Sequence, residues 1–339
     1  MNCLTLSAVP ADNARRFAGS LLSGEPSAPA LLLSPRMLIP PRALQRNGRI
    51  VVLAISSPSE MPRIEAGVRA LESRGLRVTL APNIDHRYRG YLAGDDDERL
   101  EQLNHYLKSD AIDAFFFARG GYGAMRILDR IDYGAITANP RPIIGFSDIT
   151  ALHQAVAVRC GIGGFHGPMV NLDWFEGLPP DIEQWFWSML AGDAPLTYSF
   201  DANQVVLEGE AEGILFGGCL SLTTALTATP YDFWIDDGIW FFEDIEESPY
   251  RIDRMLTHLR LAGRLQKIRA VVIGKLKGCG SDAEIEALLH EFFASSNIPV
   301  IRDLPFGHHG NNLLMPIGGA VRVSSRDRTL TLMHPAVKP

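Results

Sequence analysis

A regular alternation of short apolar runs and amphipathic segments in the first half of the chain constrains the fold most strongly. Apolar runs of strand length lie at residues 49–55, 76–82, 113–118 and 140–146. Each is followed by a segment with helical spacing or a helix-forming composition. Strands that alternate with helices predict an α/β fold with a parallel sheet covered on both faces. Because such sheets bind ligands at the carboxyl ends of their strands, functional residues are expected there.

Changes in composition divide the chain into an extension, two domains and a linker. Residues 1–46 are rich in Ala, Ser, Pro and Leu, and we expect a poorly ordered or loosely docked N-terminal extension. Residues 47–170 form the alternating N-terminal domain. Residues 171–204 are punctuated by proline and glycine and are expected to be a linker, and residues 205–335 form a second, mixed α/β domain.

Composition and charge exclude several classes of protein. The 339 residues have a net charge of −7, which argues against a nucleic-acid partner. No apolar run is long enough to span a membrane, and the first residues lack the basic start of a signal peptide. The four cysteines stand apart, without a CxxC motif or a histidine pair at metal spacing. We therefore expect a cytoplasmic protein with reduced cysteines, no metal and no cofactor.

The segment PIIGFSDIT, residues 142–150, places a serine where an apolar strand turns into a helix. Ser147 would be exposed at the edge of the sheet, and the backbone N–H of Asp148 would lie at a helix N-terminus, where a developing oxyanion is favoured. This is the arrangement of a nucleophile elbow, although the second glycine of the usual G-x-S-x-G motif is absent. The alternative is that Ser147 only caps the helix.

The glycine-rich segment FARGGYG, residues 117–123, also follows a predicted strand. It lacks the GK[ST] of a phosphate-binding loop, so phosphate binding is a weak interpretation. Gly120 or Gly121 could instead supply a second backbone N–H to an oxyanion, and Tyr122 is a candidate for contacting substrate. A tight turn without a catalytic role is the alternative.

An acidic cluster ends the apolar strand IWFFED. Its members are Glu243, Asp244, Glu246 and Glu247. A carboxylate at this place could orient a histidine, as the acid of a catalytic triad does. The alternatives are a divalent-ion site, which needs more convergent ligands, and a solvated turn paired with Arg251 and Arg254.

Two adjacent histidines lie in a loop bounded by glycines, in LPFGHHGNNLLMPIGG, residues 304–319. His308 and His309 are candidates for a general base because the histidine pKa lies near neutrality. A structural or solvated histidine is the alternative. Among the other histidines, only His166, in FHGPM, stands in a comparable context.

Six segments in this order carry a family resemblance. They are ARGGYGAMRIL, IIGFSDITALH, FHGPM, GCLSLTTAL, FFEDIEESPYRIDRML and LPFGHHGNNLLMPIGG. From about Gly48 to about Leu332, the chain resembles the LD-carboxypeptidases, serine peptidases of family S66 that include the microcin C7 self-immunity hydrolases. The resemblance implies a flavodoxin-like N-terminal domain with a parallel sheet, a smaller α/β C-terminal domain and an active site between them. It also implies a homodimer and no metal.

The resemblance implies roles for the candidate residues. Ser147 would be the nucleophile, Glu243 the acid and His308 the base. His309 would be an additional neighbour and, with Tyr122, a candidate for binding substrate. The oxyanion hole would combine the N–H of Asp148 with one from the turn that holds Gly120 and Gly121.

The implied activity is removal of a C-terminal D-Ala from muropeptide tetrapeptides in peptidoglycan recycling, through an acyl-enzyme. One alternative is a microcin-type hydrolase of aminoacyl-nucleotide amides. Its pocket would need an aromatic face for a base, and Trp174, Trp185 and Trp187 lie near the expected linker. Core or interface packing is the more ordinary role of these tryptophans. A second alternative, a non-catalytic sensor of cell-wall peptides, gains nothing from a complete Ser–Glu–His set.

Overall fold

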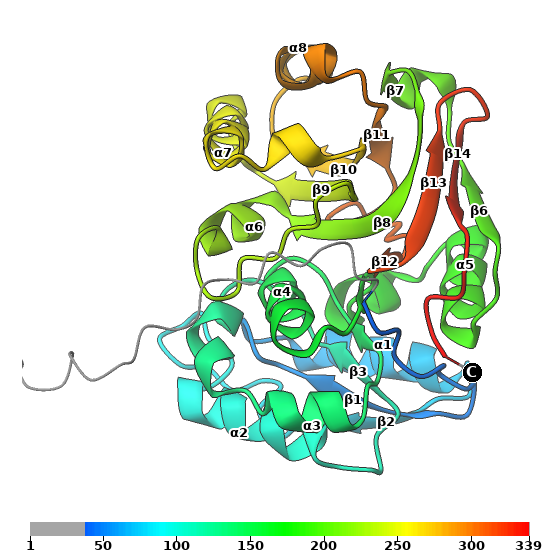
Figure 1. The fold of residues 1–339 in the computed structure, drawn as a ribbon. Coiled ribbons are helices and arrows are strands. Elements are labelled where there is room, and N and C mark those ends of the chain that lie inside the picture. The colour runs from blue at the N-terminus through cyan, green and yellow to red at the C-terminus, as the bar shows by residue number, and fades with distance from the viewer. Residues whose placement is uncertain (1–37, 339) are drawn as a thin grey trace, which may run out of the picture. The chain divides into compact units, whose positions relative to one another are not determined.

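The computed structural model describes residues 38–338, which contain two β-sheets flanked by helices (Figure 1). The strands of the first sheet are β1 (Arg49–Leu53), β2 (Arg77–Leu80), β3 (Ala114–Phe117), β4 (Ile143–Ile144), β5 (Gly164–His166) and β12 (Met315–Ile317). They lie in the order β12-β5-β4-β3-β1-β2. The pairs from β2 to β5 are parallel, and their order 2-1-3-4-5 is that of flavodoxin-like sheets. The predicted α/β fold is therefore confirmed.

Helices cover both faces of the first sheet because side chains alternate along its strands. On β1, Ile50 and Val52 pack into one hydrophobic core, whereas Val51 and Leu53 pack into another. The first part of the chain contributes α1 (Met61–Glu72), α2 (Asp96–Leu107), the 3-10 helix η1 (Ala124–Arg130), α3 (Tyr133–Ala138) and α4 (Ile149–Cys160). The core that holds Val51 also contains apolar residues of α2, α3 and α4, whereas Ile64 and Leu71 of α1 belong to the other core.

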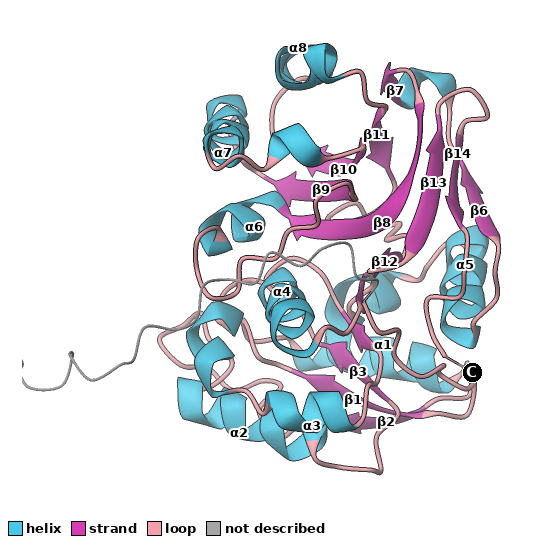
Figure 2. Ribbon diagram, in the orientation of Figure 1, coloured by secondary structure: helices cyan, strands magenta, loops and turns pink. Residues whose placement is uncertain are grey.

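The second sheet has eight strands and mixed direction (Figure 2). They are β6 (Leu196–Ser199), β7 (Val205–Leu207), β8 (Glu210–Cys219), β9 (Ile239–Ile245), β10 (Ala270–Lys277), β11 (Val300–Leu304), β13 (Ala320–Ser324) and β14 (Thr329–Leu332). Their order is β6-β14-β13-β8-β9-β10-β11-β7, and the run from β8 to β11 is parallel. The alternation in AVRVSSRDRTLTLM, residues 320–333, is typical of a β-hairpin, and its two strands, β13 and β14, pair antiparallel.

Three longer helices accompany this second sheet: α6 (Leu220–Leu226), α7 (Pro249–Leu261) and α8 (Asp282–Phe293). Short 3-10 helices lie at η3 (Ala202–Gln204), η4 (Leu265–Lys267) and η5 (Ala294–Ser296). α7 begins with proline at its first turn, and α8 begins with a capping box between Ser281 and Glu284. Both features depend only on residues in the first turn of each helix, so the starts of α7 and α8 can be predicted from the sequence.

Helix α4 lies between the two sheets in Figure 1. Its residues from Ile149 to Ala157 are all buried, as expected for a helix packed on every side. Thr150 Oγ1 accepts a hydrogen bond from the N–H of Cys219 at 3.0 Å, and Gln154 Nε2 donates to Thr223 Oγ1 at 3.0 Å. The helix that follows Ser147 is thus tied to the second sheet.

The end of the expected N-terminal extension is docked. Residues 1–37 lie outside the described residues, but Leu38 and Leu44 are buried. The N–H of Ile39 donates to Gly161 O at 2.8 Å, and the N–H of Leu44 donates to Leu190 O at 3.0 Å. For residues 38–46 the structure therefore differs from the expected poor order, because both apolar side chains and backbone groups find partners.

The segment expected to be a linker, residues 171–204, is largely structured. It contains most of the π-helical turn η2 (Val170–Trp174), α5 (Pro180–Ala191), β6 and η3. Pro180 stands at the start of α5 and Gly192 ends it in the left-handed conformation, so these residues bound a helix rather than mark a linker. The indole Nε1–H of Trp185 donates to Leu314 O at 2.9 Å, beside β12.

Residues 38–338 contain neither a candidate membrane span nor a candidate metal-binding cluster. No helix in this part of the chain combines the length and apolar character that a membrane span requires. Nor does this part contain a group of three or more His, Cys, Asp or Glu side chains arranged to hold a metal ion.

Candidate active site

Ser147 lies in the tight turn between β4 and α4. Its φ of +58° is in the left-handed region, which is uncommon for residues other than glycine and typical of strained functional turns. A Cβ added at Gly145 would lie 3.1 Å from Ile149 Cγ1, so the missing side chain makes room for the first residue of α4. This packing explains how the turn forms without the second glycine of the usual motif.

The glycine-rich turn after β3 closes over Ser147. A Cβ at Gly120 would lie 2.7 Å from Ser147 Cβ and 3.4 Å from the backbone nitrogen of Asp148. Gly121 has a φ of +112°, and a Cβ there would lie 2.2 Å from Ser57 Oγ. Glycine is therefore needed at both positions, and the turn backbone approaches the serine closely. Tyr122 is 46% exposed at the rim of this turn.

The carboxylate of Asp148 fixes the turn that holds Ser147, here called the serine turn, to two neighbouring segments. It is buried, and its Oδ2 accepts hydrogen bonds from Ser56 Oγ at 2.6 Å and from the N–H of Ala124 at 2.8 Å. Burial raises the pKa of this carboxyl, and the two hydrogen bonds and the charge of Arg99 oppose that rise. The Asp148 side chain thus links the ends of β1, β4 and the glycine-rich turn.

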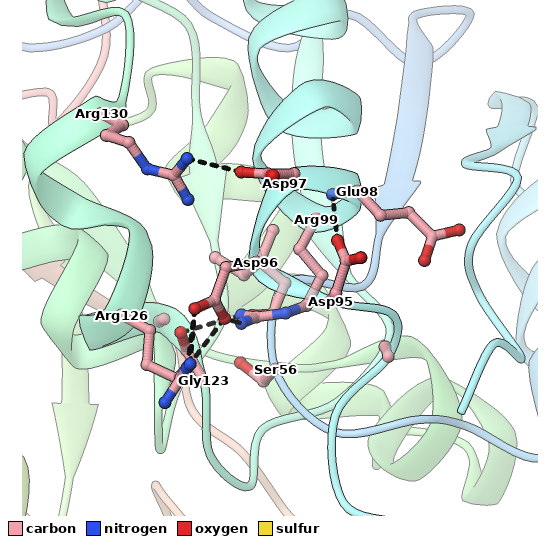
Figure 3. Close-up of polar contacts among 12 residues, drawn as sticks. Ser56, Asp95, Asp96, Asp97, Glu98, Arg99, Gly123, Arg126 and Arg130 are labelled. Carbon is pink, nitrogen blue, oxygen red and sulfur yellow. Dashed lines mark hydrogen bonds and ion pairs between the residues drawn. The ribbon is translucent and has the colours of Figure 1, made fainter. Parts of the chain in front are cut away.

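Arg99, on α2, binds the end of the glycine-rich turn (Figure 3). Its guanidinium is fully buried, donates to Ile55 O and to Gly123 O at 2.8 Å, and pairs with Asp96. Asp96 also binds Arg126 through both oxygens. Sequence analysis missed Arg99, although its spacing with Leu103 and Leu107 places it on the buried face of α2.

Glu243 and Asp244 are adjacent but make different contacts. Glu243 is fully buried, and its Oε2 accepts hydrogen bonds from His308 Nδ1 at 2.6 Å and from the His308 N–H at 3.2 Å. Asp244 accepts from the N–H of Ser221 at 2.7 Å, at the start of α6. Burial, and then the charge of Glu243, raises the pKa of Asp244. Only Glu243 therefore faces the histidine loop.

The other two acidic residues of this cluster lie nearer the surface. Glu246 is exposed and has a φ of +56°, and Glu247 pairs with Arg251 at 2.5 Å. Arg254 instead lies over the ring of Tyr250. The solvated-turn alternative thus describes Glu247 and Arg251 but not Glu243.

His308 stands between Glu243 and the serine turn. Its ring packs edge-on against Phe146, the residue before Ser147, with ring centroids 4.9 Å apart. Burial alone lowers the pKa of His308, but the hydrogen bond and charge of Glu243, with Asp244 and Asp173, outweigh burial and raise it. Since Nδ1 is bonded to Glu243, Nε2 is the ring nitrogen left for proton transfer.

The loop that carries His308 is shaped by Gly307 and Asn312. Gly307 has a φ of +84°, and a Cβ there would lie 2.3 Å from Glu243 Oε2. Its N–H donates to Asn312 Oδ1 at 3.0 Å, and Asn312 is fully buried. Sequence analysis did not single out Asn312. His309 is exposed, and burial and Lys275 lower its pKa, so it does not share the environment of His308.

Residues 50–167 match the model of the LD-carboxypeptidase N-terminal domain, and residues 212–323 match that of the C-terminal domain. The chain belongs to the LD-carboxypeptidase family, which is a family of peptidases.

Relatives cover most of the chain. A probable murein peptide carboxypeptidase of Bacillus subtilis is 32% identical over 86% of this chain and 93% of its own length. A murein tetrapeptide carboxypeptidase of Pseudomonas aeruginosa is 32% identical over 80% of this chain and 92% of its own. The solved structure of a microcin C7 self-immunity protein with glutamyl sulfamoyl guanosine shares the fold. It has a TM-score of 0.81 and 23% identity, and the match covers 89% of this chain and all of that one.

Proposed function

We propose that this chain is a serine-type LD-carboxypeptidase that removes the C-terminal D-Ala from muropeptide tetrapeptides in peptidoglycan recycling. The observation that carries the proposal is the 2.6 Å hydrogen bond between His308 Nδ1 and the buried Glu243, beside the strained turn of Ser147. The names of the relatives from B. subtilis and P. aeruginosa support murein peptides as the substrate class.

The first half of the proposed reaction forms an acyl-enzyme. His308 Nε2 takes the proton of Ser147 Oγ as the oxygen attacks the scissile carbonyl. The tetrahedral oxyanion accepts hydrogen bonds from the N–H of Asp148 and from one N–H of the Gly120–Gly121 turn. In serine peptidases the loss of one such donor costs about 2.7–4 kcal/mol of transition-state stabilisation.

The tetrahedral intermediate then collapses to the acyl-enzyme: the imidazolium of His308 gives its proton to the amine of the departing D-Ala, and Glu243 stabilises that cation and fixes the ring. The second half releases the shortened peptide. Water, deprotonated by the same histidine, attacks the ester, and the histidine returns the proton to Ser147 Oγ as the peptide leaves. This scheme requires no metal or cofactor, and we retain the homodimer and the cytoplasmic location as predictions.

The test is mass spectrometry of purified protein with the tetrapeptide L-Ala-γ-D-Glu-diaminopimelate-D-Ala. We expect the wild type to release D-Ala and Ser147→Ala to release none. Ser73→Ala is the matched control, since Ser73 is exposed at the end of α1 and its Oγ has partners close in sequence: it donates to Ala70 O and accepts from Arg74 Nη1. Activity of Ser147→Ala within tenfold of wild type would contradict the nucleophile assignment.

The two alternatives are further outcomes of this test. Glutamyl sulfamoyl guanosine, offered beside the tetrapeptide, would be the cleaved compound if the chain were a microcin-type hydrolase. Trp174 and Trp185 are buried in the core, so they offer no open aromatic face for a base, whereas Trp187 is half-buried and its indole N–H donates to Glu183 Oε1 at 3.1 Å. Tight binding of the tetrapeptide by folded wild type without turnover would instead indicate a sensor.

A further inference from the structure

His166, at the end of β5, is a fully buried histidine without a hydrogen bond. Neither of its ring nitrogens has a partner among residues 38–338. Its Nε2 lies 3.9 Å from Glu243 Oε1, and that oxygen also lacks a partner in this part of the chain. Because buried polar groups are nearly always paired, two unpaired ones that face each other call for an explanation.

Aromatic rings surround His166, and Glu243 is the acidic side chain that its Nε2 approaches. The ring packs against Phe146, Phe241 and Phe306, with centroids 5.7, 5.4 and 6.0 Å apart. Burial, and then the neighbours His153 and His308, lowers the pKa of His166 well below its ordinary value. A neutral imidazole has one N–H donor, and a carboxylate is its natural acceptor.

We propose that His166 is a positioning residue that donates its Nε2–H to Glu243 Oε1. Glu243 is then held at both oxygens, by His308 at Oε2 and by His166 at Oε1. The gap of 3.9 Å closes by a small shift of the ring toward the carboxylate. This role rests on the proposed function, because it acts on the base of that reaction through its acid.

This hydrogen bond would make His308 a weaker base. A second donor neutralises part of the charge on Glu243, so less of that charge stabilises the His308 imidazolium. The other titratable groups around this cluster are Asp244, Cys219, Asp173 and His153. His166 comes from the first sheet and Glu243 from the second, so the contact also aligns the acid with the serine turn.

The activity test compares His166→Phe, which keeps a ring but removes the donor, with His166→Gln, which keeps an N–H donor. For His166→Phe we expect kcat to fall about 10- to 100-fold, the effect seen for outer partners of functional histidines, with KM nearly unchanged. The apparent pKa on the acid side of the kcat/KM profile should rise. His166→Gln should restore both, and equal kcat and pH profiles in folded His166→Phe and wild type would overturn the proposal.

A measurement on the unaltered protein needs neither folding of a variant nor a known substrate. Nitrogen-15 NMR of labelled histidines reports which ring nitrogen carries the proton. We expect His166 to be neutral with its proton on Nε2, and a proton on Nδ1 would overturn the proposal. Failure of Ser147→Ala to lose activity would contradict the proposed function while leaving this result readable, so the two failures are distinguishable.

Discussion

At the residue scale, adjacent carboxylates at the end of β9 have separate tasks. Glu243→Gln should keep the shape of the side chain but present the wrong partner to His308 Nδ1, and we expect kcat to fall about 10³- to 10⁴-fold. Asp244→Asn keeps an oxygen that accepts from the N–H of Ser221 but loses the charge, so we expect it to lower the free energy of unfolding by no more than about 1 kcal/mol and to leave kcat within tenfold. Steady-state kinetics and thermal melts measure both effects.

The control for this pair is Glu247→Gln, since the half-buried Glu247 forms an ion pair with Arg251 rather than with His308. Because the change leaves the contact between Glu243 and His308 intact, we expect kcat close to that of the wild type. A larger loss of kcat in either Asp244→Asn or Glu247→Gln than in Glu243→Gln would show that the acid has been misassigned.

The raised pKa of His308 predicts a pH dependence of activity. A general base works only when it is neutral, so kcat/KM should fall as the pH drops through a value above the ordinary histidine pKa of about 6.5. A pH profile of kcat/KM measures this value. A midpoint below the ordinary value would contradict the raised pKa.

The same shift predicts a pH dependence of stability with a fixed sign. The folded pKa of His308 lies above the unfolded one, so its pairing with Glu243 stabilises the fold fully below the unfolded pKa. This contribution is lost as the pH rises through the folded pKa. Melting temperatures of wild type and His308→Asn should therefore converge as the pH rises past neutrality. A difference that grows with pH would contradict the assignment.

Part of this residue chemistry could be predicted from sequence. Ser147, Glu243 and His308 end strands or stand in glycine-bounded loops, and such local signals are visible in the sequence. Arg99 and Asn312 act on backbone groups far along the chain, Gly123 O in one case and the N–H of Gly307 in the other. Residue types alone do not reveal such contacts, because they depend on how the backbone folds back.

At the element scale, the loop from β11 to β12 delivers His308, and two of its glycines form a matched pair. Gly307 and Gly310 have φ values of +84° and +89°, so alanine at either should cost about 1–2 kcal/mol of stability. Only at Gly307 would the new Cβ meet Glu243, 2.3 Å from Oε2, whereas at Gly310 the nearest atom is 3.8 Å away. We expect kcat to fall about 100-fold or more for Gly307→Ala alone.

Kinetics and thermal melts of both variants make the comparison. Equal losses of kcat would indicate that backbone strain, rather than contact with Glu243, governs the loop.

Element boundaries show where sequence patterns mislead. The prolines and glycines of residues 171–204 predict a linker, yet Pro180 and Gly192 bound helix α5. Proline and glycine are found both at the ends of helices and in irregular linkers. The two cases are distinguished by whether the segment between them has an apolar face. In α5 that face includes Ile182, Trp185 and Phe186, which the core buries.

At the scale of the whole molecule, each half of the chain contacts the sheet formed mainly by the other half. β12 comes from the second half but pairs antiparallel with β5 of the first sheet. Helix α4 comes from the first half but forms hydrogen bonds to Thr223 of α6 and to Cys219, the residue before α6. We therefore expect residues 38–338 to unfold in a single cooperative transition. Calorimetry checks this through a van't Hoff enthalpy equal to the calorimetric one. Two resolved transitions would show that the sheets are independent.

The late position of β12 and His308 also has a consequence during translation. A ribosome delivers Ser147 and the glycine-rich turn well before it delivers the loop with His308. A nascent chain at that stage has the proposed nucleophile without its base, and the edge of β5 that β12 will cover is still open. On the proposed assignment, a product terminated before His308 would be inert toward peptides, so catalytic activity requires that synthesis has reached the last tenth of the chain.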